Sequence, residues 1–450
     1  MPTQTAQTAQ TAPAEAPRQD RDVLGLFPPG SSTAPDGELL VGGCAATELA
    51  EVYGTPALVV DEAAMRARAR SYADGLAARW ANSRVVFASK AFPCTAIYRL
   101  IAEEGLGADV AGGGELALAL AGGADPADMV VHGNAKTMAE LRLAVEAGVG
   151  LIVVDDFDDI NHLEALLSEP GLRSARSDSD RRQGVLVRLT PDIRPDTHEA
   201  VSTGQRGSKF GMPMEQARLA VERLRSSALL RLDGVHVHVG SQILDTEPFE
   251  RAVRAAAQLG DFDVYDLGGG LGARYTYSDR PPSVEEYLDA LVGAARRELP
   301  ANASLLIEPG RSMVAEAGMT LYRVATVKRS GDEPIVAVDG GMGDNLEVAL
   351  YGQRFEATVA TRVGGGRPHQ LVGRHCESGD VITPGTVLLQ DPRPGDLIAV
   401  PVTGAYTYSL TNNYNGALRP PVIFCRDGRS WPVVRRETYA DLIGRDLPPV

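Results

Sequence analysis

Apolar positions between residues 84 and 308 follow two different periods. Short runs of apolar residues alternate with longer stretches, such as MAELRLAVEAGV and FERAVRAAAQLG, in which apolar residues recur every three or four positions. The short runs are typical of buried strands and the longer stretches of amphipathic helices. The eight predicted strands read RVVFAS, GADVA, MVVHG, LIVVD, VLVRLT, GVHVHV, FDVYDL and SLLIE.

Strands that alternate with helices indicate an α/β fold with a parallel sheet. Eight such units over roughly 230 residues are what a (β/α)8 TIM barrel requires. A doubly wound open sheet, which is built from the same units, is the main alternative. We expect the barrel to occupy residues 57–310.

The pattern changes after Gly310. Segments such as TLYRVATVKR, PIVAVDGG and DLIAVPVTGAY are typical of strands separated by turns. Residues 311–450 are therefore predicted to form an all-β domain, joined by the N-terminal segment 23–56, whose residues 38–52 have strand character. Residues 1–22 repeat Thr, Gln and Ala and are predicted to form a disordered tail.

The composition argues against several classes of function. A formal net charge of −15 does not suit a nucleic-acid or anionic-membrane surface, because both need clustered Lys and Arg. No apolar run is long enough to cross a bilayer, and the N-terminus lacks the layout of a secretory signal. The four cysteines are scattered, which suits a reducing cytoplasm better than a disulfide framework. We therefore expect a cytoplasmic protein.

Charged residues and glycines stand where the predicted strands end. In a TIM barrel the functional site lies at these carboxyl ends. The strand-end residues are Lys90, Asp109, His132, Asp155, Arg188, His238 with Ser241, Gly268–Gly270, and Glu308 with Arg311.

The last two strand ends indicate a phosphate site. The backbone amides of Gly268–Gly270 can close around phosphate oxygens, and Arg311 would add a forked, permanently charged donor. Together with a lysine and an acid, these features suggest pyridoxal phosphate. Lys90 would form a Schiff base with its aldehyde, and a carboxylate would keep its ring nitrogen protonated. Desolvation at the strand end is expected to lower the pKa of Lys90.

The same residues also permit other interpretations. A lysine at a strand tip is usually solvated, and Arg311 and Glu308 could form a surface ion pair. His236 and His238 face the same side of one strand, a layout that can bind zinc, although a hydrogen-bonded core histidine is more common. The sequence GGGLGA fits a dinucleotide fingerprint but occurs late in the chain rather than in a first βαβ unit. The occurrence of all these residues at strand ends favours one shared site.

Ten motifs occur in an order known from one family: FASKAF, GADVAGGGELALAL, HGNAKTMAEL, STGQRGSKFGM, HVHVGSQI, DLGGGLG, EPGRS, VDGGMGDN, HCESGD and TGAYTYS. In this the chain resembles the fold-type III pyridoxal-phosphate decarboxylases, and within them the diaminopimelate decarboxylases. The resemblance implies an alanine-racemase-like barrel with a β-sandwich domain. It also implies decarboxylation of an amino acid, meso-diaminopimelate to L-lysine, in lysine biosynthesis.

The resemblance further implies roles around the cofactor. Lys90 would hold it as an aldimine, His238 would stack on the pyridine ring and Glu308 would pair with the ring nitrogen. The glycines and Ser241 would bind the phosphate, and Tyr406 would close over the cofactor. The implied cofactor-binding residues are Lys90, His238, Ser241, Gly268, Gly269, Gly270, Glu308, Gly310, Arg311 and Tyr406.

Substrate recognition is implied to involve two subunits. In the family the HCESGD segment reaches into the neighbouring subunit's site, which implies a homodimer with shared active sites. Cys376 would then be a catalytic proton donor, and Glu377 would meet a substrate amine. No metal is implied, and His236 is expected to pack in the core. The implied substrate-binding residues are Arg311, Glu347, Tyr351, Glu377 and Tyr406.

One segment departs from the family pattern. The family usually reads N-P-R-P-A-L-Y where this chain reads NLEVALY, so that Glu347 replaces an arginine that helps to hold the distal carboxylate. If Glu347 faces the site, it repels a distal carboxylate and favours a substrate with a distal amine or neutral group. This chain would then be a paralogue that decarboxylates another amino acid or amino-acid conjugate. If Glu347 points to solvent, Arg311 alone serves the carboxylate. A binding protein without catalysis is a further alternative, although Lys90 and Cys376 are both present.

Overall fold

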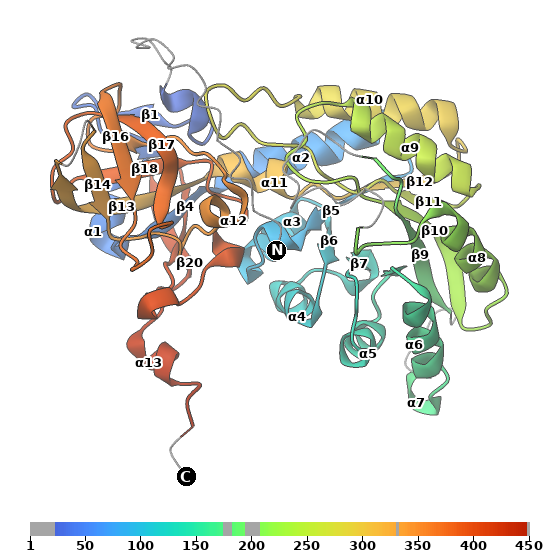
Figure 1. The fold of residues 1–450 in the computed structure, drawn as a ribbon. Helices are drawn as coiled ribbons and strands as arrows, with labels where there is room; N and C mark the ends of the chain where they lie inside the picture. Colours follow the sequence, from blue (N-terminus) through green and yellow to red (C-terminus); the bar gives the residue numbers. More distant parts are fainter. Residues whose placement is uncertain (1–22, 174–181, 194–207, 330–332, 448–450) are drawn as a thin grey trace, which may run out of the picture.

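The computed structural model describes residues 23–173, 182–193, 208–329 and 333–447. They form a barrel and a second, sheet-based domain that lie side by side (Figure 1). The predicted tail at residues 1–22 lies outside the described residues. No helix in the described ranges combines the length and apolarity needed to cross a lipid bilayer.

All eight strands predicted for the barrel are present and parallel. They close in chain order, because the last strand pairs with the first, and this closure excludes the doubly wound open sheet. The strands are β5 (Ser83–Ala88), β6 (Gly107–Val110), β7 (Met129–Val131), β8 (Leu151–Val154), β9 (Gln183–Leu189), β10 (Leu230–Val237), β11 (Val264–Asp266) and β12 (Ser304–Ile307).

Helices that precede or connect these strands cover the outside of the barrel (Figure 1). The two amphipathic stretches singled out in the sequence form α5 and α9, and α5 begins with a capping box between Thr137 and Glu140. The helices are α2 (Glu62–Arg79), α3 (Thr95–Glu103), α4 (Gly113–Gly122), α5 (Met138–Ala147), α6 (Phe157–Leu167), α7 (Pro170–Arg173), α8 (Met214–Arg225), α9 (Glu247–Leu259) and α10 (Val284–Glu298).

The second domain is built on a mixed nine-stranded sheet with short helices at its margins. Most pairs are antiparallel, but β4 pairs with β19, and β14 with β16, in parallel. Its strands are β4 (Ala57–Asp61), β13 (Gly318–Lys328), β14 (Ile335–Val338), β15 (Thr358–Val359), β16 (Arg367–Val372), β17 (Val381–Leu389), β18 (Leu397–Pro401), β19 (Val422–Arg426) and β20 (Arg429–Val434). Its helices are α11 (Arg311–Val314), α12 (Glu347–Tyr351) and α13 (Tyr439–Ile443), and α13 projects away from the sheet (Figure 1).

Two expectations about the N-terminal part differ from the structure. Strand β4, expected to begin the barrel domain at residue 57, lies inside the nine-stranded sheet between β13 and β19. Residues 38–52 are only partly extended: β2 (Leu39–Val41) and β3 (Cys44–Ala45) form a small sheet with β1 (Ser32–Thr33), and α1 (Ala46–Tyr53) follows. The helix forms because one of its faces is apolar and packs against the core of the sheet domain.

Candidate active site

An open cavity of about 290 Å³ lies at the carboxyl ends of the barrel strands. Several strand-end residues predicted from the sequence border it together, although they are far apart in the chain. These are Lys90, Asp109, His132, Arg188, His238 and Glu308. The cavity is therefore at the place that the barrel fold assigns to a functional site.

Lys90 stands in a short 3-10 turn, Ser89–Ala91, directly after β5. The neighbouring Ser89 and Ala91 are buried, while Lys90 is exposed to the cavity. The prediction of a lowered pKa for Lys90 is wrong. Loss of hydration does act to lower this pKa, but the nearby Tyr406 and the carboxylates outweigh it, so that the pKa of Lys90 is raised.

A second lysine borders the cavity but is already engaged. The ammonium of Lys136 lies 2.6 Å from the carboxylate of Asp159 and donates to the carbonyl oxygen of Gly133, also at 2.6 Å. Both charged side chains of this ion pair are buried. Within the described ranges Lys90 has no such partner, so its amine is the one that can react with a carbonyl group.

The glycine loop after β11 depends on close backbone packing. A Cβ atom at Gly269 would lie 2.1 Å from the carbonyl oxygen of Glu308, and one at Gly270 would lie 2.4 Å from the carbonyl oxygen of Gly240. Gly268 has a φ of 65°, a conformation that favours glycine. The amide of Gly269 donates to His238 Nδ1 at 3.3 Å. The loop therefore joins the last three strands of the barrel at the rim of the site.

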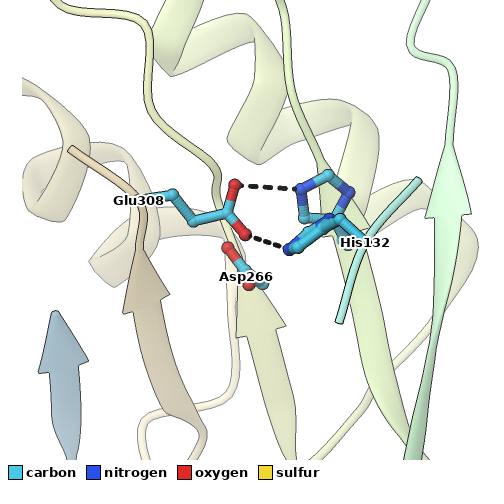
Figure 2. A group of neighbouring side chains, drawn as sticks. His132, Asp266 and Glu308 are labelled. Atoms are coloured by element: carbon cyan, nitrogen blue, oxygen red, sulfur yellow. Dashed lines mark hydrogen bonds and ion pairs between the residues drawn. The ribbon is translucent and has the colours of Figure 1, made fainter. Parts of the chain in front are cut away.

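Glu308 is the centre of a buried polar group at the end of β12. His132 Nε2 lies 2.5 Å from one carboxylate oxygen and His236 Nε2 lies 3.4 Å from the other. Figure 2 shows His132 and Asp266 around this carboxylate. Burial acts to raise the pKa of Glu308, but the two imidazoles outweigh it and hold the pKa well below its ordinary value. Glu308 is therefore an anion, as pairing with a protonated ring nitrogen requires.

His236 was expected to pack in the core, and it is buried, but its contact with Glu308 also makes it part of the site. Burial lowers the pKa of His236 to about 3, so its ring is neutral. His132, His236, Asp266 and Glu308 are donor types that also bind divalent metals, and their ligand atoms lie within 4.8 Å of one another. The zinc interpretation considered from the sequence used His236 with His238, whereas the geometry groups His236 with Glu308.

Arg311 connects several predicted residues beside the cavity. It begins α11 after Gly310, whose Cβ atom would lie 2.9 Å from that of Ala88, so that the loop can approach β5 only with glycine there. The guanidinium of Arg311 donates to Ser241 Oγ at 3.2 Å and stacks on the ring of Tyr406 at 4.5 Å.

Glu347 faces inward. Its exposed fraction is 0%, and its Oε1 accepts from Arg311 Nη1 at 2.9 Å, so the solvent-facing alternative is wrong. Arg311 also donates to the hydroxyl of Tyr275, a buried residue that no sequence motif had indicated. Burial raises the pKa of Glu347, although Arg311 opposes this shift.

Tyr406 is tied to the turn that carries Lys90. Its backbone amide donates to the carbonyl oxygen of Ala91 at 2.8 Å, and its φ of 57° is uncommon for a residue other than glycine. This anchor brings a residue of the sheet domain to the barrel rim. Tyr351 lies at the end of α12, the helix that begins with Glu347.

Cys376 and Glu377 do not border the cavity of their own chain. Both are exposed, in the segment between β16 and β17, and the amide of Cys376 donates to Asn415 Oδ1 at 2.8 Å. All four cysteines are free thiols. The cavity of one chain therefore lacks the predicted proton donor.

Arg188 and Asp155 form a buried pair at the wall of the barrel. Arg188 Nη1 lies 3.4 Å from Asp155 Oδ1, and its guanidinium lies 4.5 Å from the ring centre of Phe210. Phe210 belongs to the motif STGQRGSKFGM, of which residues 202–207 lie outside the described part of the chain.

A free lysine amine after the first barrel strand, a glycine cradle after the seventh and an anionic carboxylate after the eighth define a pyridoxal-phosphate-dependent enzyme. The residues fit this cofactor: Lys90 borders the cavity without an ion-pair partner in the described ranges, and Glu308 is ionised. Residues 62–315 match the family model described as "Pyridoxal-dependent decarboxylase, pyridoxal binding domain". The chain belongs to the pyridoxal-dependent decarboxylases, and its cofactor is pyridoxal phosphate.

Several similar proteins are diaminopimelate decarboxylases. The chain is 44% identical over 435 residues to the diaminopimelate decarboxylase of Actinosynnema pretiosum subsp. auranticum, with 94% of this chain and 95% of that protein covered. It is 41% identical to the enzyme of Bacillus subtilis, with 92% and 96% covered. The crystal structure of the diaminopimelate decarboxylase from M. jannaschii in complex with L-lysine matches this chain with a TM-score of 0.85 at 30% identity, with 94% of this chain and 98% of that chain covered.

Proposed function

We propose that this enzyme converts meso-diaminopimelate into L-lysine and acts in lysine biosynthesis. Its similarity to diaminopimelate decarboxylases extends over nearly the whole of both chains, and this observation carries the proposal. The solved structure of a similar diaminopimelate decarboxylase contains L-lysine, which supports L-lysine as the product. The proposal concerns the substrate, since the decarboxylase family itself is established by the match.

Bound pyridoxal phosphate supplies an electron sink for the bond that breaks when CO₂ leaves. In the proposal Lys90 attaches the cofactor covalently, and Glu308 holds a proton on the ring nitrogen. His238 supports the face of the ring. The amide of Gly269 donates to the Nδ1 of His238, which fixes the orientation of this imidazole.

The neighbouring subunit completes the site in this proposal. Cys376 and Glu377 are exposed on the sheet domain and do not border the cavity of their own chain. A homodimer would bring them to the partner's cavity, where the thiol of Cys376 gives a proton to the carbon that has lost CO₂. Glu377 would accept from a substrate amine.

The pair formed by Arg311 and Glu347 favours a second candidate substrate class. A guanidinium that is paired with a buried carboxylate offers less net positive charge to a distal carboxylate. An amino acid or amino-acid conjugate with a distal amine or neutral group does not need this positive charge for binding. This class is the alternative to meso-diaminopimelate.

CO₂ release by the purified holoenzyme tests both candidates. The panel contains meso-diaminopimelate, lysine, ornithine, arginine and glutamate conjugates at equal concentrations. We expect the highest kcat/KM for meso-diaminopimelate, with L-lysine as the product. Turnover of another member without turnover of meso-diaminopimelate would show that the alternative substrate class is correct.

We also propose a cytoplasmic location. The four free thiols, three of which are buried, suit a reducing compartment. The expectation that the protein binds neither nucleic acid nor membrane stays a prediction from its net charge of −15. Fractionation of cells that express the protein, with a cytoplasmic marker enzyme as reference, tests the location.

A further inference from the structure

Asp266, the last residue of β11, connects two parts of the site. Its side chain is fully buried, and its Oδ1 accepts from the amide of Gly268 at 3.0 Å. Its Oδ2 has no hydrogen-bond partner among the described residues. A ligand atom of Asp266 lies within 4.8 Å of one of Glu308, and Figure 2 shows the two carboxyl groups facing each other.

Gly268 contacts Asp266 and Glu308 at the same time. Its amide donates to the side chain of Asp266, while its carbonyl oxygen accepts from the amide of Glu308 at 2.8 Å. One residue of the glycine loop is thus held by both strand ends. A shift of Asp266 would move the loop and Glu308 together.

We propose that Asp266 is a positioning residue that sets the glycine loop and the Glu308 carboxylate at a fixed separation. The loop and Glu308 would hold the two ends of the cofactor, its phosphate and its ring nitrogen. Asp266 touches neither end and acts through its contacts with Gly268 and Glu308. This inference rests on the cofactor roles proposed for those residues.

The carboxyl group of Asp266 is expected to be protonated beside the ionised Glu308. Burial, reinforced by repulsion from Glu308, raises the pKa of Asp266 well above its ordinary value. A neutral carboxyl group keeps one acceptor for Gly268 and gains an O–H donor on the side of Glu308. Two adjacent anions in a buried site would repel each other instead.

The test measures cofactor affinity, because activity alone would not separate positioning from catalysis. Apoenzymes of the wild type, Asp266→Asn and Asp266→Ala are titrated with pyridoxal phosphate and followed by the visible band of the bound cofactor. Asp266→Asn keeps an acceptor and a neutral donor, so its Kd should stay within about threefold of the wild type. Asp266→Ala leaves buried groups unpaired and should weaken binding about tenfold or more.

Asp344 offers a matched control in the sheet domain. It is also buried, accepts from a glycine amide, Gly341, at 2.9 Å, and has one oxygen without a partner in the described structure. Asp344→Ala should lower the melting temperature but leave the cofactor Kd within about twofold. An Asp266→Ala variant with unchanged Kd, or an Asp266→Asn variant as weak as Asp266→Ala, would overturn the proposal.

A double variant tests whether Asp266 acts through Glu308. The loss in affinity for Asp266→Ala with Glu308→Ala should be smaller than the two single losses combined, because the residues share one network. If the two losses in cofactor affinity add up in the double variant, Asp266 does not act through Glu308. Binding of Zn²⁺ alone by the apoenzyme, at one ion per chain and lost in Asp266→Asn, would overturn the proposal in favour of a metal site. None of these measurements uses an amino-acid substrate, so an incorrect substrate assignment would not affect them.

Discussion

The Nη1 atom of Arg311 lies 2.9 Å from Oε1 of Glu347, and both side chains are buried. Arg311 also stacks on Tyr406 and donates to Ser241, two residues predicted to bind the cofactor. The glutamate that departs from the family pattern therefore pairs with the arginine that contacts Ser241 and Tyr406. A substrate carboxylate that approaches Arg311 must compete with an anion that is already in place.

The variant Glu347→Arg should shift specificity toward meso-diaminopimelate. Charges a few ångströms apart interact by roughly 1–4 kcal/mol at effective dielectric constants of 80 to 20. Since about 1.4 kcal/mol corresponds to a factor of ten in rate, kcat/KM for meso-diaminopimelate relative to lysine should rise about tenfold or more. Steady-state kinetics on both substrates measures this ratio.

The control for this substitution is Glu347→Gln, which removes the anion without adding a cation. The ratio of kcat/KM for meso-diaminopimelate to kcat/KM for lysine in Glu347→Gln should fall between the ratios of the wild type and Glu347→Arg. A general loss of stability would lower kcat/KM for both substrates together and leave the ratio unchanged. A high wild-type turnover of meso-diaminopimelate with an unchanged ratio in both variants would place Glu347 outside substrate recognition.

The variant Lys90→Ala should lose covalent attachment of the cofactor and all turnover while it keeps its fold. Lys90 is the cavity lysine without an ion pair in the described ranges, so no other amine is positioned to replace it. The measurement is the visible absorbance band and its disappearance on borohydride treatment, with circular dichroism to check the fold. A band that borohydride still abolishes in this variant would show that another lysine carries the cofactor.

The variant Lys136→Met should keep covalent attachment but lose stability. Removing the ammonium leaves the buried carboxylate of Asp159 without its partner, a change that costs about 3–5 kcal/mol. Urea denaturation measures the free energy of unfolding. Arg70→Met is the comparison, because the side chain of Arg70 is exposed and solvent screens its pair with Glu104, so this variant should lose less stability than Lys136→Met.

Mixing two inactive variants should restore activity if the sites are shared between subunits. Random assortment of Lys90→Ala and Cys376→Ala chains makes half of the dimers mixed, and each mixed dimer has one intact site. About a quarter of the wild-type activity is therefore expected after subunit exchange. Absence of recovery, with exchange demonstrated by differently tagged chains, would mean that each chain carries a complete site.

Local pattern was enough to predict the barrel. Its strands are short apolar runs, and in helices such as α5 and α9 apolar residues recur every three or four positions, so that both kinds of element can be recognised without knowledge of the rest of the chain. The strand ends then followed from the strands, which is why Lys90, His238 and Glu308 could be predicted to lie together before their distances were known.

The partners of those residues could not be predicted in this way. Strand β4 begins at residue 57, where the barrel domain was expected to begin, and its sequence ALVVD is compatible with either sheet. Only its pairing with β13 and β19 assigns it to the nine-stranded sheet. The sequence pattern did not single out Asp266. Its closeness to Glu308 depends on how β11 and β12 pair.

The sequence by itself determined the class of enzyme, the lysine and the glycine loop, because these depend on residue type and on position within one strand and its loop. Tertiary structure decided the charge states and the pairings. The pKa of Lys90 is raised rather than lowered because Tyr406, Asp109 and Glu308, far from it in the chain, surround its ammonium. Glu347 meets Arg311 because the fold brings the start of α12 to the start of α11, although the two residues lie far apart in the chain. Electrostatic interactions depend on distances through space, and these distances are fixed only when the two domains are assembled.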